Sequence, residues 1–182
     1  MAFVIFFSIV LLVHIGVNYY LFRHTRPLFS IEGWIGLGLK AAFILLVISY
    51  PIGRTLERLL PSATSEFIAK VGAFWLGAML YLTLLFLLFD LVKLIFNYTG
   101  FPSLLNPSNG MTQLRKVVIG IYAITAIVLT AGYINALYPR VNQIKITTNK
   151  NIDGYESLKI GMASDIHLGT IITNGRLERF VR

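Results

Sequence analysis

Apolar residues fill most of the chain up to Tyr138 and gather in four long runs separated by short polar segments. An α-helix needs about 20 mainly apolar residues to cross the hydrocarbon core of a bilayer. Each run reaches that length, so the pattern predicts membrane spans at about residues 2–22, 33–53, 70–93 and 117–138. Because the connecting segments are short, we expect an antiparallel four-helix transmembrane bundle, an all-α membrane domain over residues 1–139.

The residues between the spans predict where the helices end. Pro51 and Gly53 are expected to end the second span, because proline and glycine interrupt helices. The segment from Arg54 to Phe67 is compatible with either a short amphipathic helix at the membrane surface or a plain loop. The linker from Tyr98 to Gln113 is rich in Pro, Asn, Ser and Gly and is expected to be a loop.

After Pro139 the chain becomes polar. The stretch "VNQIKITTN" (Val141 to Asn149) alternates apolar and polar residues as a half-buried strand does, and "LKIGMAS" (Leu158 to Ser164) predicts a second strand. "TNGRLERFVR" (Thr173 to Arg182) is expected to begin a helix. Strand, polar loop and helix form the opening unit of an α/β domain, here residues 140–182. A segment this short and polar cannot close a hydrophobic core, so we expect the domain to be truncated.

The amino-acid composition supports a membrane protein. Of the 182 residues, 56% are hydrophobic and 13% are charged, whereas soluble domains carry roughly 25% charged residues. The net charge of +8 is expected in loops that face the cytoplasm and anionic headgroups, which makes membrane lipids the expected partners. No Lys/Arg cluster interleaved with aromatic residues occurs, which argues against nucleic-acid binding. The absence of cysteine excludes disulfides and thiolate metal sites.

The basic residues that flank the spans predict the orientation in the membrane. They divide into Arg23, Arg26, Lys93, Arg115 and Lys116 on one side and Arg54, Arg58 and Lys70 on the other. Loops rich in Lys and Arg stay in the cytoplasm, so the first side is expected to be cytoplasmic. Both termini, and the domain after Pro139, are then expected outside the cytoplasm, in a multi-pass protein of the cell membrane.

Several polar side chains lie within or beside the spans. Asp90 and Lys93 are spaced i,i+3 and are expected to pair near the headgroups. His14 and Asn18 are spaced i,i+4 and therefore share one face of the first span. They are compatible with a lipid-headgroup or ion site, or with hydrogen bonds between helices of the bundle.

The tail contains one pair of residues with metal-ligand chemistry, Asp165 and His167. They follow an expected strand, and α/β folds gather functional groups at the carboxyl ends of strands. In an extended loop, residues i and i+2 can converge on one cation. A carboxylate oxygen with an imidazole nitrogen suits Mn, Fe, Zn or Ni better than Ca. The bare tripeptide also fits a turn-capping aspartate followed by a surface histidine.

The longer stretch "LKIGMASDIHLG" (Leu158 to Gly169) resembles the first motif of the calcineurin-like metallophosphoesterases, an apolar strand, a serine and then D-x-H-L-G. It looks especially like the bacterial membrane-anchored subgroup, in which several spans precede the motif. The resemblance implies that Asp165 and His167 are metal ligands. They would bind the first of two divalent transition metal ions (Mn, Fe, Zn or Ni) in a dinuclear centre that hydrolyses phosphate mono- or diesters.

The other motifs of that family, G-D-x-x-D, G-N-H-D/E and G-H-x-H, do not occur in this sequence. The resemblance therefore implies that the chain is the N-terminal part of the enzyme and is inactive as given. The implied partner is a phosphoester substrate, with lipid-linked phosphates an attractive class because the enzyme would be anchored in the membrane. The alternative is a non-enzymatic four-span scaffold, sensor or transporter subunit with a polar tail.

Overall fold

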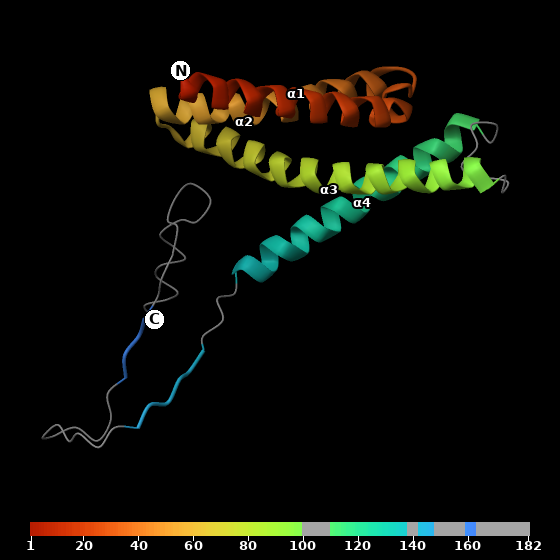
Figure 1. Ribbon diagram of the computed structural model, residues 1–182. Helices are drawn as coiled ribbons and strands as arrows, with labels where there is room; N and C mark the ends of the chain where they lie inside the picture. Colours follow the sequence, from red (N-terminus) through yellow and green to blue (C-terminus); the bar gives the residue numbers. More distant parts are fainter. Residues whose placement is uncertain (100–109, 138–141, 148–158, 163–182) are drawn as a thin grey trace, which may run out of the picture. The chain divides into compact units, whose positions relative to one another are not determined.

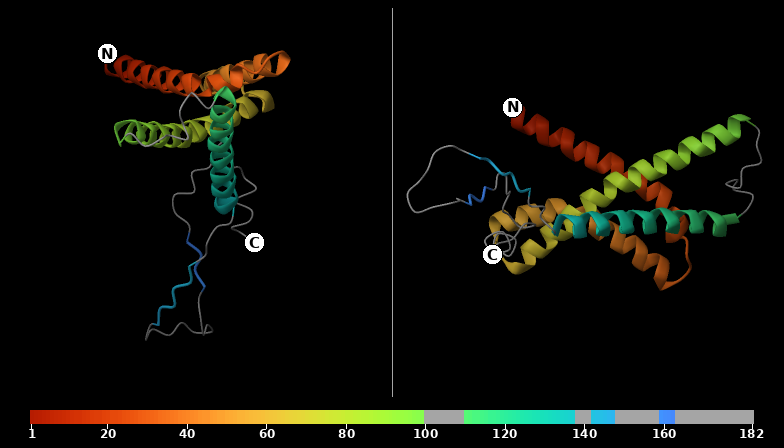
Figure 2. Two further views of the ribbon diagram at one scale, coloured as in Figure 1. Left: turned by 90° about the vertical axis from the view of Figure 1, so that its right-hand side faces the viewer. Right: turned by 90° about the horizontal axis from the view of Figure 1, so that it is seen from below.

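The computed structural model describes residues 1–99, 110–137, 142–147 and 159–162 (Figure 1). Those residues contain four helices: α1 (Ala2–Phe29), α2 (Trp34–Leu59), α3 (Ala63–Thr99) and α4 (Gly110–Leu137). Each helix is long and apolar enough to cross a membrane, which confirms the prediction of four spans. In Figures 1 and 2, α1 and α3 run in one direction and α2 and α4 run in the other, as expected for antiparallel neighbours.

The helices extend beyond the predicted spans. α3 is the longest, with 37 residues, or ~55 Å at 1.5 Å per residue. The hydrocarbon core is only about 30 Å thick. The uncharged stretch from Val71 to Phe89 covers ~28 Å and fits that thickness. The charged residues Lys70, Asp90 and Lys93 lie outside this stretch, so both ends of α3 reach the level of the headgroups.

The prediction that Pro51 and Gly53 end the second span is wrong, because α2 continues through both residues to Leu59. A proline within a helix leaves the carbonyl four residues earlier without its usual amide donor. Here that carbonyl belongs to Val47, and Nε2 of His14 on α1 approaches it at 3.1 Å. The side chain from the neighbouring helix therefore replaces the missing backbone donor, as happens for prolines in membrane helices.

The segment from Arg54 to Phe67 forms neither a separate amphipathic helix nor a plain loop. Its first part completes α2, and its last part begins α3 at Ala63. Ser62 ends the short connection: its Oγ accepts from the backbone N–H of Ser65 at 3.2 Å, while Oγ of Ser65 accepts from the Ser62 N–H at 2.9 Å. This reciprocal pair satisfies amide groups at the start of the helix.

Small residues line the contact between α2 and α3. Ser49 and Gly53 on α2 and Ala69 and Gly72 on α3 are buried. A Cβ added to Gly53 would lie 2.6 Å from the backbone nitrogen of Ala69, and one added to Gly72 would overlap the backbone of Tyr50. The two backbones therefore approach each other directly, as in membrane helix pairs built on small residues four apart.

All four helices contribute to one apolar core. Its buried members are Leu21, Phe43, Trp75, Leu82, Phe86, Val118 and Ile121. The indole of Trp75 and the ring of Phe43 meet edge to face with centroids 5.3 Å apart, a favourable geometry for aromatic pairs. Most other large apolar side chains are exposed along the outer faces of the helices. Apolar outer faces around a core that also holds polar groups fit contact with membrane lipids.

Contacts within the chain divide it into two units, Met1–Gly132 and Tyr133–Arg182. In the second unit, residues 133–137 complete α4, and the other described residues, 142–147 and 159–162, are exposed and form no strand. Parts of both expected strands fall in these two segments, so the α/β domain is not visible there. The rest of the expected domain, including the helix at Thr173–Arg182, lies outside the described residues.

Candidate functional site

The two predicted metal ligands, Asp165 and His167, lie outside the described residues, so the structure gives no geometry for them. In the described part of the chain, no group of three or more His, Asp or Glu side chains is placed to hold a metal ion. The polar groups that the structure does bring together lie inside the helical bundle, and most of them come from α1.

One face of α1 makes polar contacts with each of the other three helices. Going along the helix, His14 reaches α2, Asn18 reaches α3, His24 reaches α3 and Thr25 reaches α4. Asn18 and Thr25 are 4% and 3% exposed, so their hydrogen bonds replace contacts with water. Within the described residues, no buried side-chain nitrogen or oxygen lacks a partner. α1 therefore carries the polar connections of the bundle.

The first cluster confirms that His14 and Asn18 form hydrogen bonds between helices. Besides the contact of His14 with Val47, the side chain of Asn18 uses both ends of its amide. Its Nδ2 donates to the His14 carbonyl oxygen at 2.8 Å and contacts Sδ of Met79 at 3.2 Å. Its Oδ1 accepts from Nε1 of Trp75 at 3.0 Å. All these contacts join groups of the protein, as expected for polar side chains that hold the helices together.

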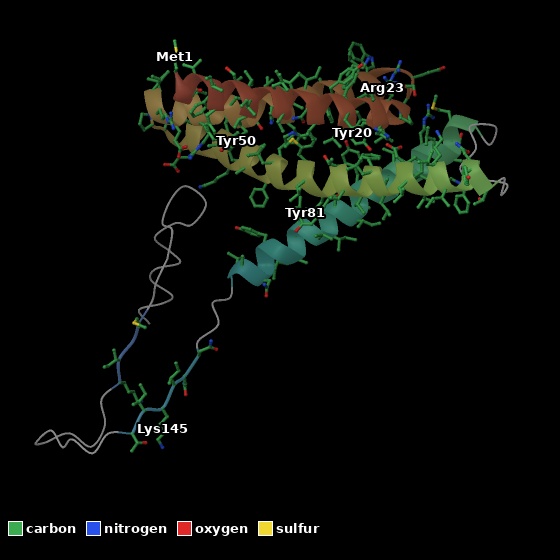
Figure 3. All side chains as sticks on the ribbon, viewed as in Figure 1. Met1, Tyr20, Arg23, Tyr50, Tyr81 and Lys145 are labelled. Carbon is green, nitrogen blue, oxygen red and sulfur yellow. The ribbon has the colours of Figure 1, made fainter. Side chains whose placement is uncertain are left out.

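The second cluster consists of Tyr20, His24 and Asp90 (Figure 3 labels Tyr20). The hydroxyl of Tyr20 donates to Oδ2 of Asp90 at 2.8 Å, and Nε2 of His24 lies 3.0 Å from Oδ1 of the same carboxylate. The ring of His24 also packs on that of Phe86, with centroids 5.0 Å apart. The side chains of His24 and Asp90 are 22% and 41% exposed, so the cluster is sheltered but reachable from one side.

Asp90 was expected to pair with Lys93, and this prediction is wrong. Asp90 forms its ion pair with His24 on α1, with Oδ1 3.0 Å from Nε2. The carboxylate of Asp90 faces α1, where two donors from adjacent turns of that helix reach its two oxygens. Packing of α1 against α3 therefore decides the partner, and spacing along α3 does not.

The end of α1 is attached to α4. Oγ1 of Thr25 and the hydroxyl of Tyr122 lie 2.8 Å apart. The guanidinium of Arg115 donates through Nε to the Pro27 carbonyl at 2.9 Å and through Nη2 to the Ser30 carbonyl at 3.1 Å. A helix leaves its last four carbonyls without backbone donors, and Arg115 supplies donors to this end of α1. The charged side chain thus stabilises this end of α1.

Tyr20, His24, Trp75 and Tyr122 were not predicted from the sequence as members of interior clusters. A signal was available for His24, because Tyr20 and His24 are spaced i,i+4 and share a face in the same way as His14 and Asn18. No such signal pairs Trp75 with Asn18 or Tyr122 with Thr25, since those contacts join different helices.

No protein-family model, curated protein or solved structure matches this chain. The likeness to the calcineurin-like metallophosphoesterases therefore rests on the residues from Leu158 to Gly169 and on the four spans before them.

Proposed function

We propose that this chain is the membrane-anchored N-terminal part of a metal-dependent phosphoesterase that hydrolyses phosphate mono- or diesters. The observation that carries the proposal is the stretch "LKIGMASDIHLG", which stands behind four membrane-spanning helices. The helices would anchor the enzyme, and Asp165 and His167 would begin its metal site. The proposal requires residues outside the printed sequence to supply the remaining ligands.

The chemistry of Asp165 and His167 fits this role. One carboxylate oxygen and one imidazole nitrogen form a mixed donor set that suits Mn, Fe, Zn or Ni. Two such cations in a dinuclear site neutralise charge on the reacting phosphoryl group and provide a nucleophilic water at neutral pH. Two protein ligands are fewer than one ion needs, because tetrahedral and octahedral sites take about four and six. The contribution of this chain is therefore to hold and orient part of the first ion's coordination shell.

The membrane anchor bears on the substrate and on the location of the site. Four helices keep the tail close to the bilayer, which raises the local concentration of phosphoesters carried by lipids. A phospholipid or a lipid-linked pyrophosphate is therefore the substrate class that benefits most from this arrangement. Five basic residues lie on one side of the spans and three on the other, which supports a location of the tail outside the cytoplasm in a protein of the cell membrane.

Metal analysis of the full-length protein tests the proposal. The double variant D165A/H167A should lose more than about tenfold in metal affinity, since even indirect partners of metal ligands contribute 10–100-fold. The matched control is D153A, which removes an aspartate from the same tail outside the motif. Equal metal content in the double variant and the wild type would refute the metal site.

Activity separates the proposal from the non-enzymatic alternative. A scaffold, sensor or transporter subunit should keep its function when Asp165 and His167 are replaced, whereas the phosphoesterase should lose hydrolysis. Lipid-borne and soluble phosphoesters offered in the same detergent then test the substrate class. A preference for the soluble compounds would count against the lipid-linked substrate while leaving the phosphoesterase itself in place.

A further inference from the structure

Both ring nitrogens of His24 face oxygen atoms. Nδ1 lies 3.0 Å from the backbone carbonyl oxygen of Tyr20, and Nε2 lies 3.0 Å from Oδ1 of Asp90. A carbonyl oxygen only accepts hydrogen bonds, so Nδ1 must carry a proton. A carboxylate oxygen also only accepts, so the second contact needs a proton of its own. A neutral imidazole has only one N–H and cannot satisfy both contacts.

His14, in the same helix, needs only one ring proton to satisfy its contacts. Its Nε2 faces the Val47 carbonyl at 3.1 Å and must donate. The amide nitrogen Nδ2 of Asn18, which is a donor, lies 3.4 Å from Nδ1 and 3.3 Å from Nε2 of the ring, so Nδ1 faces no acceptor there. One proton on the ring therefore suffices for His14. The difference between the two histidines arises from their neighbours, because both belong to α1 and both are partly buried.

The geometry points to a proton-binding site formed by Tyr20, His24 and Asp90, which holds α1 to α3 while its proton is bound. The proton sits on Nε2 of His24 and gives an imidazolium facing a carboxylate. The Tyr20 hydroxyl donates to the other oxygen of Asp90, so each carboxylate oxygen has a donor from α1. This inference concerns the membrane helices and does not depend on the phosphoesterase proposal.

The other charged and titratable groups near the site come from three helices. α1 contributes Arg23 and Arg26 beside His24, and α3 contributes Lys93 one turn beyond Asp90. From α4, Tyr122 is bonded to Thr25, and Arg115 is bonded to the carbonyls of Pro27 and Ser30. Asp90 is thus the acidic partner of His24 in a largely basic neighbourhood.

Loss of the proton weakens the contact between the two helices. A neutral His24 that keeps its proton on Nδ1 presents the lone pair of Nε2 to Oδ1 of Asp90, and both atoms are then acceptors. The contact should therefore hold while this proton is bound and open when it is lost.

Nitrogen NMR on the 182-residue chain in lipid nanodiscs, labelled with ¹⁵N-histidine, tests the site directly. The chain has three histidines, and the variants H14Q and H167Q assign their signals. At low pH, His24 should show two protonated ring nitrogens. As the pH is raised, His24 should lose its second proton earlier in D90N than in the wild type, because the amide supplies no negative charge. A His24 that is neutral at low pH in the wild type, or one that loses its second proton at the same pH in D90N and the wild type, would overturn the inference.

Distance measurements test the effect on the helices. The chain contains no cysteine, so spin labels at Y19C and L91C, two exposed positions, would be the only thiol-linked labels. The distance between the labels should lengthen, or its distribution should broaden, as the pH rises. The variant D90N should remove this pH dependence, and H14Q should retain it. A distance that does not change with pH in the wild type would show that the proton does not hold α1 to α3.

Discussion

At the scale of single residues, one imidazole connects α1 to the proline-containing turn of α2. Pro51 has no N–H, and the Val47 carbonyl that it leaves free accepts from His14 at 3.1 Å. An unsatisfied buried carbonyl costs about 1–3 kcal/mol, and in a bilayer no water replaces the donor. The histidine and the proline should therefore be energetically coupled.

A double-mutant cycle measures that coupling. H14A should lower the free energy of unfolding by about 1–3 kcal/mol, because it leaves the Val47 carbonyl without a donor. In a P51A background, the new N–H of residue 51 can donate to that carbonyl, and the cost of H14A should fall by at least about 1 kcal/mol. Unfolding in mixed micelles measures the free-energy cost of H14A in the wild-type and in the P51A background. If the two substitutions prove additive, His14 does not stand in for the missing amide.

The residue scale also shows what the sequence could predict about the interior. Spacing within a helix correctly grouped His14 with Asn18, because i,i+4 positions share a face whatever the helix packs against. The same reasoning failed for Asp90, whose partners His24 and Tyr20 lie on another helix. Contacts between helices depend on packing, and a single sequence does not encode that packing in its spacing.

At the scale of elements, the close approach of α2 and α3 depends on positions that lack a side chain. Gly53 faces the backbone of Ala69, whereas a Cβ added to Gly38 on the same helix would meet no described atom within 4 Å. The two glycines therefore offer a matched pair of substitutions within one element.

We expect G53A to lower the stability of the bundle and G38A not to lower it. Alanine is favoured over glycine within helices by about 1 kcal/mol, so G38A should leave the bundle as stable as the wild type or slightly more stable. G53A should destabilise it by about 1–3 kcal/mol, because the helices must move apart. Thermal unfolding of the two variants in the same detergent compares them. Equal stability of the two variants would show that Gly53 is not needed for the contact.

The ends of the elements were predicted less well than their existence. Pro51 and Gly53 were interpreted as stop signals because they interrupt helices in water. Inside a bundle, the proline finds a donor on α1, and the glycine gives α3 room to approach. The residues that suggested an end of the helix are thus the ones that join it to its neighbours.

At the scale of the whole molecule, apolar length alone identified the four spans, because a bilayer requires it of any helix that crosses. The tail carries no comparable constraint. Its expected strands would be stabilised by partners elsewhere in a domain, and the described residues 142–147 and 159–162 form no strand. The proposed metal ligands belong to that same tail, so the candidate site could be predicted from a motif but not from the fold.

Cysteine labelling tests the arrangement of the whole chain in the membrane. Since the native chain has no cysteine, E32C and P61C each introduce a single exposed thiol in a connection between helices. With an antiparallel bundle and the proposed orientation, a membrane-impermeant maleimide applied outside intact cells should label P61C and the tail variant K145C but not E32C. Labelling of E32C alone would reverse the orientation. Labelling of both E32C and P61C would contradict the alternation of the spans.

The contact between His14 and Pro51 also has an evolutionary consequence. The two residues depend on each other: the proline at position 51 leaves the Val47 carbonyl without its backbone donor, and that carbonyl is the acceptor for the imidazole at position 14. Among proteins descended from one ancestral gene, those in which Pro51 has been replaced by a residue with an N–H should therefore also come to carry residues other than histidine at position 14. Loss of the histidine first should be rare, because that intermediate would be the less stable of the two.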